Sequence, residues 1–420
     1  MAEPPIRARW KIDPAPIVIL AGVCAALHVG KLPPAITALQ QALGMSLVQA
    51  GFLLSLVQLA GMSVGVMFGV AADALGLRRS MVCGLLVLGA ASALGGAARD
   101  VATLMTLRAV EGFGFLLVAL PAPGLIRQLV APHRMSLMLG LWSAYMPFAT
   151  ALALLLGPIV IAAAGWQAWW WGLAGASLLM ALVVARTVPC PPQRSAMSPN
   201  ARAPAQWAQW PSRLRQTLQV RGIWLVAMMF AFYAGQWLAV IGFLPVIAAQ
   251  AGWSGAALGG LTALAAAVNI VGNLATGRLL QRGIAPAALL HAGFVAMGLA
   301  AIAAFAGEPP AGLAPHWRYS AVLVFSMLGG LIPATLFALA VRLAPGENTL
   351  ATTVGWVQQW SAFGQFAAPP LVAWVASRTG TWQWTWLVTC GCCGLGLVLA
   401  ARIAAVSRRA ADDYSTAAGN

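Results

Sequence analysis

Charged residues are rare in this sequence. Only 8% of its 420 residues are charged, nine are acidic and four are histidines, whereas 61% are hydrophobic. A soluble domain has about 25% charged residues, so a water-soluble fold cannot be built from this composition. The chain also has no Gly-x-x-x-x-Gly-Lys-Ser/Thr loop to bind phosphates, and its few histidines and acids cannot form a catalytic cluster. We therefore expect neither an ATP-driven pump nor an enzyme, and no cofactor.

The six cysteines indicate neither disulfides nor a metal site. None lies on a loop expected to face the outer side, where oxidation could pair two thiols. Cys390 and the adjacent Cys392 and Cys393 have no histidine and no second cysteine cluster beside them. They are expected to be small buried hydrophobic residues, and no bound metal is predicted.

Twelve apolar segments exceed the roughly 18 residues that a helix needs to cross a bilayer. They are continuous, whereas membrane β-strands alternate with a period of two, so helices are predicted rather than a barrel. Arg7, Arg9 and Lys11 precede the first segment as in a signal peptide, but no small-residue cleavage site follows, so we expect a retained helix. The predicted spans are residues 16–36, 47–72, 80–98, 101–126, 137–163, 168–188, 222–248, 255–277, 286–306, 319–341, 350–376 and 384–404.

Basic residues in alternate loops predict the orientation, because positively charged loops remain cytoplasmic. With both termini cytoplasmic, 19 of the 24 lysines and arginines lie on the inner side, and Arg108 lies within a span. Only Lys31, Arg99, Arg318 and Arg378 are expected outside. The net charge of +15 is scattered over short loops, so it does not predict a nucleic-acid surface. The predicted location is a bacterial inner membrane.

The spans form two related halves. Pro121 corresponds to Pro333 and Pro158 to Pro370, each about 212 residues later. A parallel repeat of this kind is typical of carriers whose solute site lies between the halves. An interfacial helix is expected near 207–218. The expected divisions are a cytoplasmic tail at 1–15, the first half at 16–188, a proline-rich and arginine-rich cytoplasmic linker at 189–221, the second half at 222–404 and a cytoplasmic tail at 405–420.

The loop after the second span carries a motif, Gly69-Val-Ala-Ala-Asp73-Ala-Leu-Gly76-Leu-Arg78-Arg79. Gly69 permits close helix packing, and Gly76 suits a tight turn. The two arginines anchor the loop to the inner face of the membrane. The motif resembles the signature loop of the major facilitator superfamily, Gly-x-x-x-Asp-x-x-Gly-x-Arg/Lys-Arg/Lys.

The resemblance covers residues 12–405 and implies twelve helices in two pseudosymmetric halves, usually working as a monomer. In the family the aspartate of this loop lies against the start of the eleventh helix and latches the cytoplasmic side closed. This agrees with the attraction of a carboxylate to a helix N-terminus. We therefore expect Asp73 to be a latch, with Asn348 or Thr349 capping that helix. The alternative is that Asp73 is a solvated loop acid.

The fourth span contains a charged pair. Arg108-Ala-Val-Glu111-Gly-Phe-Gly114 resembles the family motif Arg-x-x-Gln/Glu-Gly-x-Gly. Arg108 and Glu111 are three residues apart, hence on one helix face and able to pair. Charges within a membrane are costly, so the pair is a candidate functional site. Two interpretations remain open for Glu111: it carries the coupling proton, or it is a permanently ionised structural partner of the arginine. His28 is the other candidate proton carrier.

Polar residues near the middle of the spans are candidates for a solute cavity, which in the family is lined by the first, fourth, seventh and tenth helices. In the eleventh span, Gln358, Ser361 and Gln365 form one stripe at spacings i, i+3 and i+7. A single polar residue in a membrane helix often only binds a neighbouring helix, so each remains a candidate. The candidates are His28, Tyr233, Gln236, Ser326, Thr335, Gln358 and Gln365.

The sequence therefore predicts a secondary carrier that moves a small organic solute by alternating access, with protons and the lipid bilayer as its other partners. We favour uptake of an anionic solute, because an arginine and few acids disfavour cations. The alternative is proton-antiport export of a drug-like or siderophore-like compound, since Leu156-Gly157-Pro158 matches a fragment of the antiporter pattern. Metal import and solute sensing without transport are weaker alternatives, because paired methionine ligands and a signalling domain are not found in the sequence.

Overall fold

The computed structural model describes residues 13–189, 199–307, 312–346 and 349–418, which form helices and short turns without a strand. The first half contains α1 (Pro14–Gly30), η1 (Pro33–Ala35), α2 (Ile36–Leu43), α3 (Leu47–Ser55), η2 (Leu56–Gln58), α4 (Leu59–Leu75), α5 (Leu77–Gly95), α6 (Val101–Ala119), α7 (Ala122–Leu129), α8 (Pro132–Ser143) and α9 (Tyr145–Thr187). The linker contains α10 (Pro199–Gln219). The second half contains α11 (Arg221–Gln250), α12 (Gly255–Ala267), α13 (Asn269–Gln281), α14 (Pro286–Phe305), α15 (Pro315–Gly329), α16 (Leu331–Leu343), α17 (Leu350–Thr379) and α18 (Thr385–Ala418).

Ten helical segments of the described chain have the length and hydropathy to cross a membrane, compared with the twelve predicted spans. The difference has two causes. Gly165, with φ 82° and ψ 165°, divides the 43 residues of α9 into two helices. The 30 residues of α17 are long enough to cross, but their mean hydropathy is lower than that of the other ten segments, because they include Gln358, Gln359 and Gln365. With these two corrections the helices give twelve crossings, six in each half.

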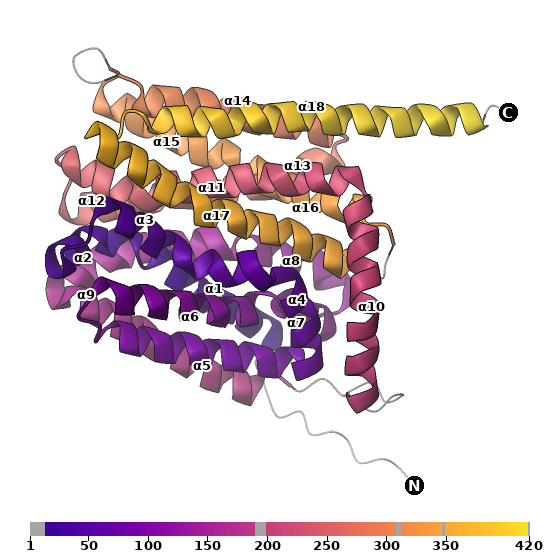
Figure 1. Ribbon diagram of the computed structural model, residues 1–420, viewed down its shortest axis with the longest axis horizontal. Helices are drawn as coiled ribbons and strands as arrows, with labels where there is room; N and C mark the ends of the chain where they lie inside the picture. Colours follow the sequence, from indigo (N-terminus) through magenta and orange to yellow (C-terminus); the bar gives the residue numbers. More distant parts are fainter. Residues whose placement is uncertain (1–12, 190–198, 308–311, 347–348, 419–420) are drawn as a thin grey trace, which may run out of the picture.

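The two halves pack side by side, the first in indigo to magenta and the second from rose through orange to yellow in Figure 1. Between them, α17 packs against α3 and α4, and α12 packs against α9. The first contact is close because Gly51 of α3 has no side chain: a Cβ there would lie 2.8 Å from Pro370 Cα. At the second contact a Cβ on Gly259 would lie 3.4 Å from Leu154 O. Small residues therefore allow the halves to approach closely at both of these contacts.

Two segments outside the bundle are more helical than the sequence suggests. α10 extends well beyond the expected 207–218 and crosses the ends of the bundle helices in Figure 1. Its Thr217 hydroxyl lies 3.3 Å from that of Thr353 on α17. α18 continues to Ala418, so most of the expected C-terminal tail is a helix that projects from the bundle in Figure 1. Residues 1–12 and 190–198 lie outside the described part of the chain.

The first span is broken where Pro33 and Pro34 follow α1. Proline has no N–H, so in a continuous helix these residues could not bond to the carbonyls of Val29 and Gly30. α1 therefore ends at Gly30, and the chain continues through the short turn η1 into α2. The second span is also interrupted, by η2 between α3 and α4. Both breaks leave carbonyl groups available for side chains from other helices.

The closest approach of α17 to α11 gives a test of this packing. A Cβ on Gly364 would lie 1.9 Å from Ala231 O, a backbone atom that cannot move aside as a side-chain end can. Gly364→Ala is therefore expected to destabilise the protein by about 1–3 kcal/mol, seen as a lower unfolding temperature in detergent. Gly277→Ala is the control, because its added Cβ has no neighbour within 4 Å. Equal unfolding temperatures for the two variants would contradict the packing described here.

Candidate functional site

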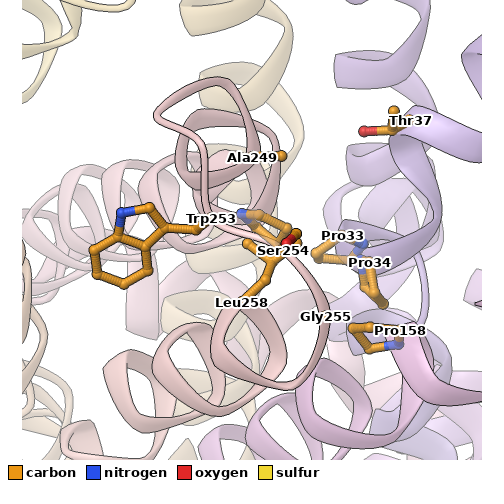
Figure 2. A pocket seen from close by; sticks show the side chains of 10 residues that line it. Pro33, Pro34, Thr37, Pro158, Ala249, Trp253, Ser254, Gly255 and Leu258 are labelled. Carbon is orange, nitrogen blue, oxygen red and sulfur yellow. The ribbon is translucent and has the colours of Figure 1, made fainter.

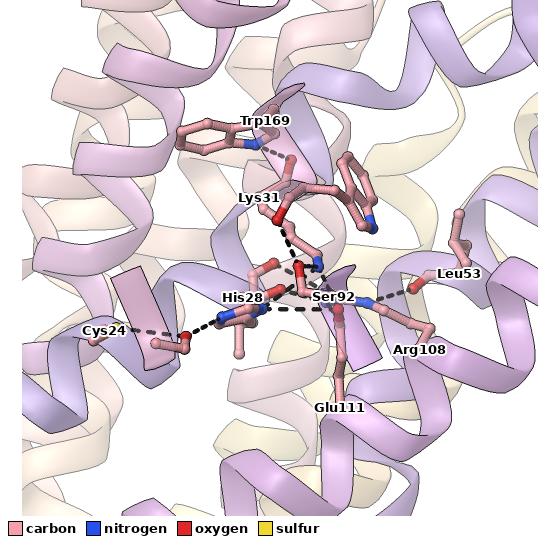
Figure 3. Close-up of polar contacts among 11 residues, drawn as sticks. Cys24, His28, Lys31, Leu53, Ser92, Arg108, Glu111 and Trp169 are labelled. Atoms are coloured by element: carbon pink, nitrogen blue, oxygen red, sulfur yellow. Dashed lines mark hydrogen bonds and ion pairs between the residues drawn. The ribbon is translucent and has the colours of Figure 1, made fainter. Parts of the chain in front are cut away.

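Glu111 is the centre of a buried charged cluster in the first half (Figure 3). Its side chain is only 2% exposed, and each carboxylate oxygen has its own cation. Lys31 Nζ donates to Oε1, and Arg108 Nη1 donates to Oε2 over 2.8 Å. His28 lies against the same carboxylate, with Nδ1 3.8 Å from Oε1. These four residues are called the charged cluster below.

The Arg108 guanidinium is bound on several sides. Apart from the carboxylate, it binds backbone carbonyls: Nε donates to Leu53 O over 3.2 Å, Nη1 to His28 O, and Nη2 to Val29 O over 3.4 Å. The Val29 carbonyl is free because Pro33 has no N–H to donate to it. Arg108 is 2% exposed, so it joins α6 to α1 and α3 and does not face a cavity. The expectation of an anionic solute, which depended on this arginine, therefore loses its support.

Lys31 lies inside the protein and not on the outer loop where the sequence analysis places it. Its side chain is 0% exposed. Nζ donates to Ser92 Oγ over 3.0 Å and lies 4.6 Å from the centre of the Trp170 ring, in a cation–π contact. A lysine at the end of an apolar run and before two prolines is typical of a loop, which is why hydropathy misplaces it. The break after α1 instead keeps the side chain among the helices, and three basic residues remain on the predicted outer side.

His28 connects the lysine to a chain of neutral groups. Its Nδ1 lies 3.4 Å from Lys31 Nζ, and its Nε2 lies 2.8 Å from Ser177 Oγ. An ammonium group can only donate, so Nδ1 accepts and Nε2 carries the hydrogen. Ser177 Oγ also lies 3.6 Å from the Sγ of Cys24, which is one turn before His28 on α1. His28 is 0% exposed and thus belongs to the charged cluster and not to a cavity wall.

The surroundings of the cluster come entirely from the first half. Ser92 of α5 donates through Oγ to Trp170 O over 2.9 Å, and Trp169 Nε1 donates to Lys31 O over 3.0 Å. Both tryptophans lie on α9, as does Ser177. Helices α1, α3, α5, α6 and α9 are therefore held around one set of charges. Sequence analysis did not find Ser92 or Ser177, because a lone serine in an apolar helix has no distinguishing pattern.

The second half has no charge at the equivalent positions. Prolines define which positions of the two halves correspond, since Pro245 follows Pro33 by 212 residues and Pro333 follows Pro121 by the same number. At this offset the positions of Lys31, Arg108 and Glu111 are occupied by Phe243, Ser320 and Leu323. The charged cluster is therefore a feature of one half and not of the repeated fold.

Two predicted cavity residues of the second half, Tyr233 and Ser326, belong to a neutral buried cluster. Asn269 Nδ2 donates to Tyr233 Oη over 3.1 Å and to Ser326 O over 2.8 Å. Trp237 Nε1 donates to Ser326 Oγ over 3.1 Å. Tyr233 is 5% exposed and Ser326 is 0% exposed. These groups join α11, α13 and α15 within the half and do not line an open cavity in this conformation.

Two further candidates, Gln236 and Thr335, are also 0% exposed. Gln236 Oε1 accepts from Cys393 Sγ of α18 over 3.3 Å, so this amide is directed towards the outer wall of its own half. Its Nε2 is buried without a partner among the described residues. Thr335 Oγ1 donates to Leu331 O of its own helix over 2.7 Å. Both are placed for helix packing in this conformation.

Glutamines form the polar contact between the halves. Gln58 Nε2, at the break between α3 and α4, donates to Gln365 Oε1 of α17 over 3.1 Å. Gln365 Nε2 in turn donates to Ser361 Oγ over 3.3 Å. Gln359 Oε1 accepts from a backbone N–H of α4 over 3.2 Å. Gln358, the remaining member of the predicted stripe, is half-buried. The contact therefore contains uncharged groups that both donate and accept hydrogen bonds.

The signature loop turns at Gly76, whose φ of 85° favours glycine. Beyond the turn, Arg78 Nη2 donates to Ala185 O of α9, which ties the loop to the sixth span. Arg79 is exposed. The arginines thus differ in their contacts, although the motif treats them alike.

The proposed latch stays a prediction. The surroundings of Gly69 and the side chain of Asp73 lie outside what the structure describes, and so does Asn348. Thr349 stands at the N-cap of α17, but its hydroxyl donates to Gly346 O over 2.8 Å and accepts from Gly346 N. It therefore closes the preceding turn and does not cap the helix.

A cavity of about 240 Å³ lies between the halves (Figure 2). Much of its wall is rigid and apolar, with Pro33, Pro34 and Pro158 from the first half and Pro245 from the second. Cavities that bind small molecules usually measure about 300–1,000 Å³ and have several polar groups. This cavity is smaller and less polar, so we assign no solute to it.

Comparisons with known proteins agree with this architecture. The sequence profile described as Major Facilitator Superfamily matches residues 18–369. Among solved structures, the crystal structure of a D-xylose-proton symporter is similar, with a TM-score of 0.68 and 15% sequence identity over 93% of this chain and 96% of that one. At this identity the similarity shows the fold alone. No curated protein sequence matches the chain.

The profile covers most of the chain and both halves, and the structural similarity extends over nearly all of it. The motifs quoted from the loop after the second span and from the fourth span lie within the matched residues. The chain is a multi-pass membrane transporter and not an enzyme, and it belongs to the Major Facilitator Superfamily.

Proposed function

We propose that this chain is a secondary carrier that moves a small organic solute by alternating access and couples this movement to protons. The charged cluster is the observation that supports coupling. Burying an ion costs several kcal/mol even after relaxation, and charges within a membrane are usually functional. The second half builds equivalent helices without these charges, so the fold itself does not require them.

The contact between the halves supports alternating access. The charged cluster lies within one half, whereas the contact between the halves is made mainly by α17 against α3 and α4 and by α12 against α9. The halves can therefore rock about the glutamine contact without opening the cluster. Asp73 remains our candidate for the latch that closes the cytoplasmic side.

Uptake is the preferred direction. The similar structure is that of a proton symporter, so this fold is compatible with proton-driven uptake. Support for export is weaker, because Gly157 of the antiporter fragment has a packing role: a Cβ there would lie 2.5 Å from Pro34 Cγ. A drug-like or siderophore-like substrate exchanged for protons is the second candidate, and the sign of proton movement separates the two.

The solute is proposed to be polar and uncharged. The side chains at the contact between the halves include Gln58, Ser361 and Gln365, which offer amide and hydroxyl groups. Such groups donate and accept hydrogen bonds without a charge preference. The cations Lys31 and Arg108 are enclosed in the charged cluster. We propose that the protein works as a monomer, as is usual in the family, in a bacterial inner membrane. Its basic inner loops support cytoplasmic termini.

Glu111→Gln tests proton coupling. In proteoliposomes with a pH-sensitive dye inside, a panel of sugars, organic acids and amphipathic drugs is screened for solute-dependent proton movement. The wild type is expected to move protons inward with an imported solute, and Glu111→Gln is expected to lose this movement, because two cations then lack their counter-charge. Asp100→Asn is the control: the N–H of Thr103 lowers the pKa of Asp100, so this change also removes a charge from α6, but at its exposed end.

Folding is checked separately in the same variants. Losing one partner of a buried ion pair can cost about 3–5 kcal/mol, whereas the double variant Lys31→Met with Glu111→Gln removes one charge of each sign. The double variant is therefore expected to regain stability in detergent but not proton movement. Proton movement in Glu111→Gln equal to that of the wild type would contradict a coupling role for the cluster.

A cross-link between the halves tests alternating access. A Cβ on Gly65 of α4 would lie 3.6 Å from Gln359 Cβ of α17, within the range that disulfides span. Oxidation of Gly65→Cys with Gln359→Cys is expected to stop solute-dependent proton movement, and reduction is expected to restore it. Each single cysteine variant is the control. Undiminished movement after complete cross-linking would show that α4 and α17 do not need to separate.

A further inference from the structure

Lysine is almost absent from this chain. Of its 24 basic residues only Lys11 and Lys31 are lysines, and the other 22 are arginines. Arginine remains charged at every physiological pH, whereas a lysine in a protein can lose its proton. One of the two lysines is the completely buried Lys31. The charged cluster thus contains one cation that keeps its charge, Arg108, and one that can release a proton.

The number of charges in the cluster makes Lys31 the group whose proton is in excess. Arg108 and Glu111 form a neutral pair, in which the guanidinium is also bound by three carbonyls. Lys31 adds one uncompensated positive charge in this buried site. Loss of its proton makes the cluster neutral. Protonation of Glu111 or of His28 would instead raise the net charge from +1 to +2, which a buried site disfavours.

The contacts of Lys31 suit both protonation states. The ammonium form is stabilised by Glu111 of α6 and by the face of Trp170 on α9. The amine form retains Ser92 Oγ of α5 at 3.0 Å as an acceptor, since a neutral amine still has two N–H groups to donate. The charged or titratable groups around it are Glu111, Arg108 and His28, and α5 and α9 contribute only neutral side chains to its contacts.

His28 offers a place for the released proton. Its unprotonated Nδ1 is 3.4 Å from Lys31 Nζ, and the Nε2–H is 2.8 Å from Ser177 Oγ. Ser177 Oγ in turn lies 3.6 Å from the Sγ of Cys24, which is one turn before His28 on α1. The groups Lys31, His28, Ser177 and Cys24 therefore form a hydrogen-bonded row along α1, partly visible in Figure 3.

We infer that Lys31 takes up and releases the coupled proton and that His28 is its exchange partner. In the release step the Nζ–H bond breaks and an Nδ1–H bond forms, while Nε2 gives its proton to Ser177 Oγ. Ser177 passes its own proton to Cys24 Sγ, and this thiol, the one member of the row with some exposure, gives its proton to a water molecule. His28 remains neutral and changes tautomer, and Lys31 becomes an amine. This assignment rests on the proposed proton coupling, in which Glu111 then acts as the fixed counter-charge of the carrier.

Nuclear magnetic resonance of the lysine side chains tests the assignment without a solute. The chain is labelled with ¹³C- and ¹⁵N-lysine and reconstituted in nanodiscs, and Lys11→Arg leaves Lys31 as the single labelled residue. The Lys31 resonances are expected to change from those of an ammonium to those of an amine within the physiological pH range. An ammonium spectrum throughout that range would overturn the assignment.

Transport of the solute found in the proteoliposome screen gives the second test. Lys31→Arg keeps the charge but cannot release a proton, so it is expected to lose solute-driven proton movement and to keep exchange of labelled solute at equal pH on both sides. Lys11→Arg is the matched control and should behave as the wild type. Proton movement retained in Lys31→Arg would overturn the role of Lys31. If instead the wild type moves no protons with any solute, the proposed coupling fails, and the resonance experiment still decides whether Lys31 exchanges a proton.

Discussion

The ion pairs of Glu111 with Lys31 and Arg108 are the interaction on which the first half depends. A single carboxylate pairs with two cations, one at the end of α1 and one on α6, and the same cations bind groups of α3, α5 and α9. In lipid, helix association receives little help from the hydrophobic effect, because the surrounding chains are as apolar as the helix surfaces. Polar contacts of this kind therefore fix which helices are neighbours and how they are rotated.

The cluster exists because the first span is broken. Two prolines end α1 early, which leaves carbonyls of its last turn without their usual N–H partners. Arg108 satisfies one of these carbonyls, that of Val29, while it also binds His28 O and Glu111. The backbone break and the buried arginine thus compensate each other. An unbroken α1 would need no such donor, and an arginine without these carbonyls would be a costly buried charge.

Much of the fold follows from the sequence, because long apolar runs, a repeat of about 212 residues and basic loops are all features of composition and order. The pairing of Arg108 and Glu111 was accessible for a similar reason, since residues three apart share a helix face. The buried position of Lys31 could not be predicted in this way, because hydropathy assigns a charged residue at the end of a span to the water outside. The directions of Tyr233, Gln236 and Ser326 were equally hidden: lipid and protein interior are both apolar, so apolar periodicity does not reveal which face of a membrane helix meets its neighbours.

The separation of charged and uncharged polar groups has a consequence for how coupling can operate. The contact between the halves consists of amides, hydroxyls and small residues, and these can slide and re-form without exposing a charge. The charges are enclosed in one half, so rocking of the halves does not by itself change their protonation. Coupling therefore requires that a change of charge in the cluster alters the packing of α1, the helix that carries both Lys31 and His28. Because α1 continues through η1, which contacts α11 of the second half, a change at Lys31 has a short and continuous path to the surface where the halves meet.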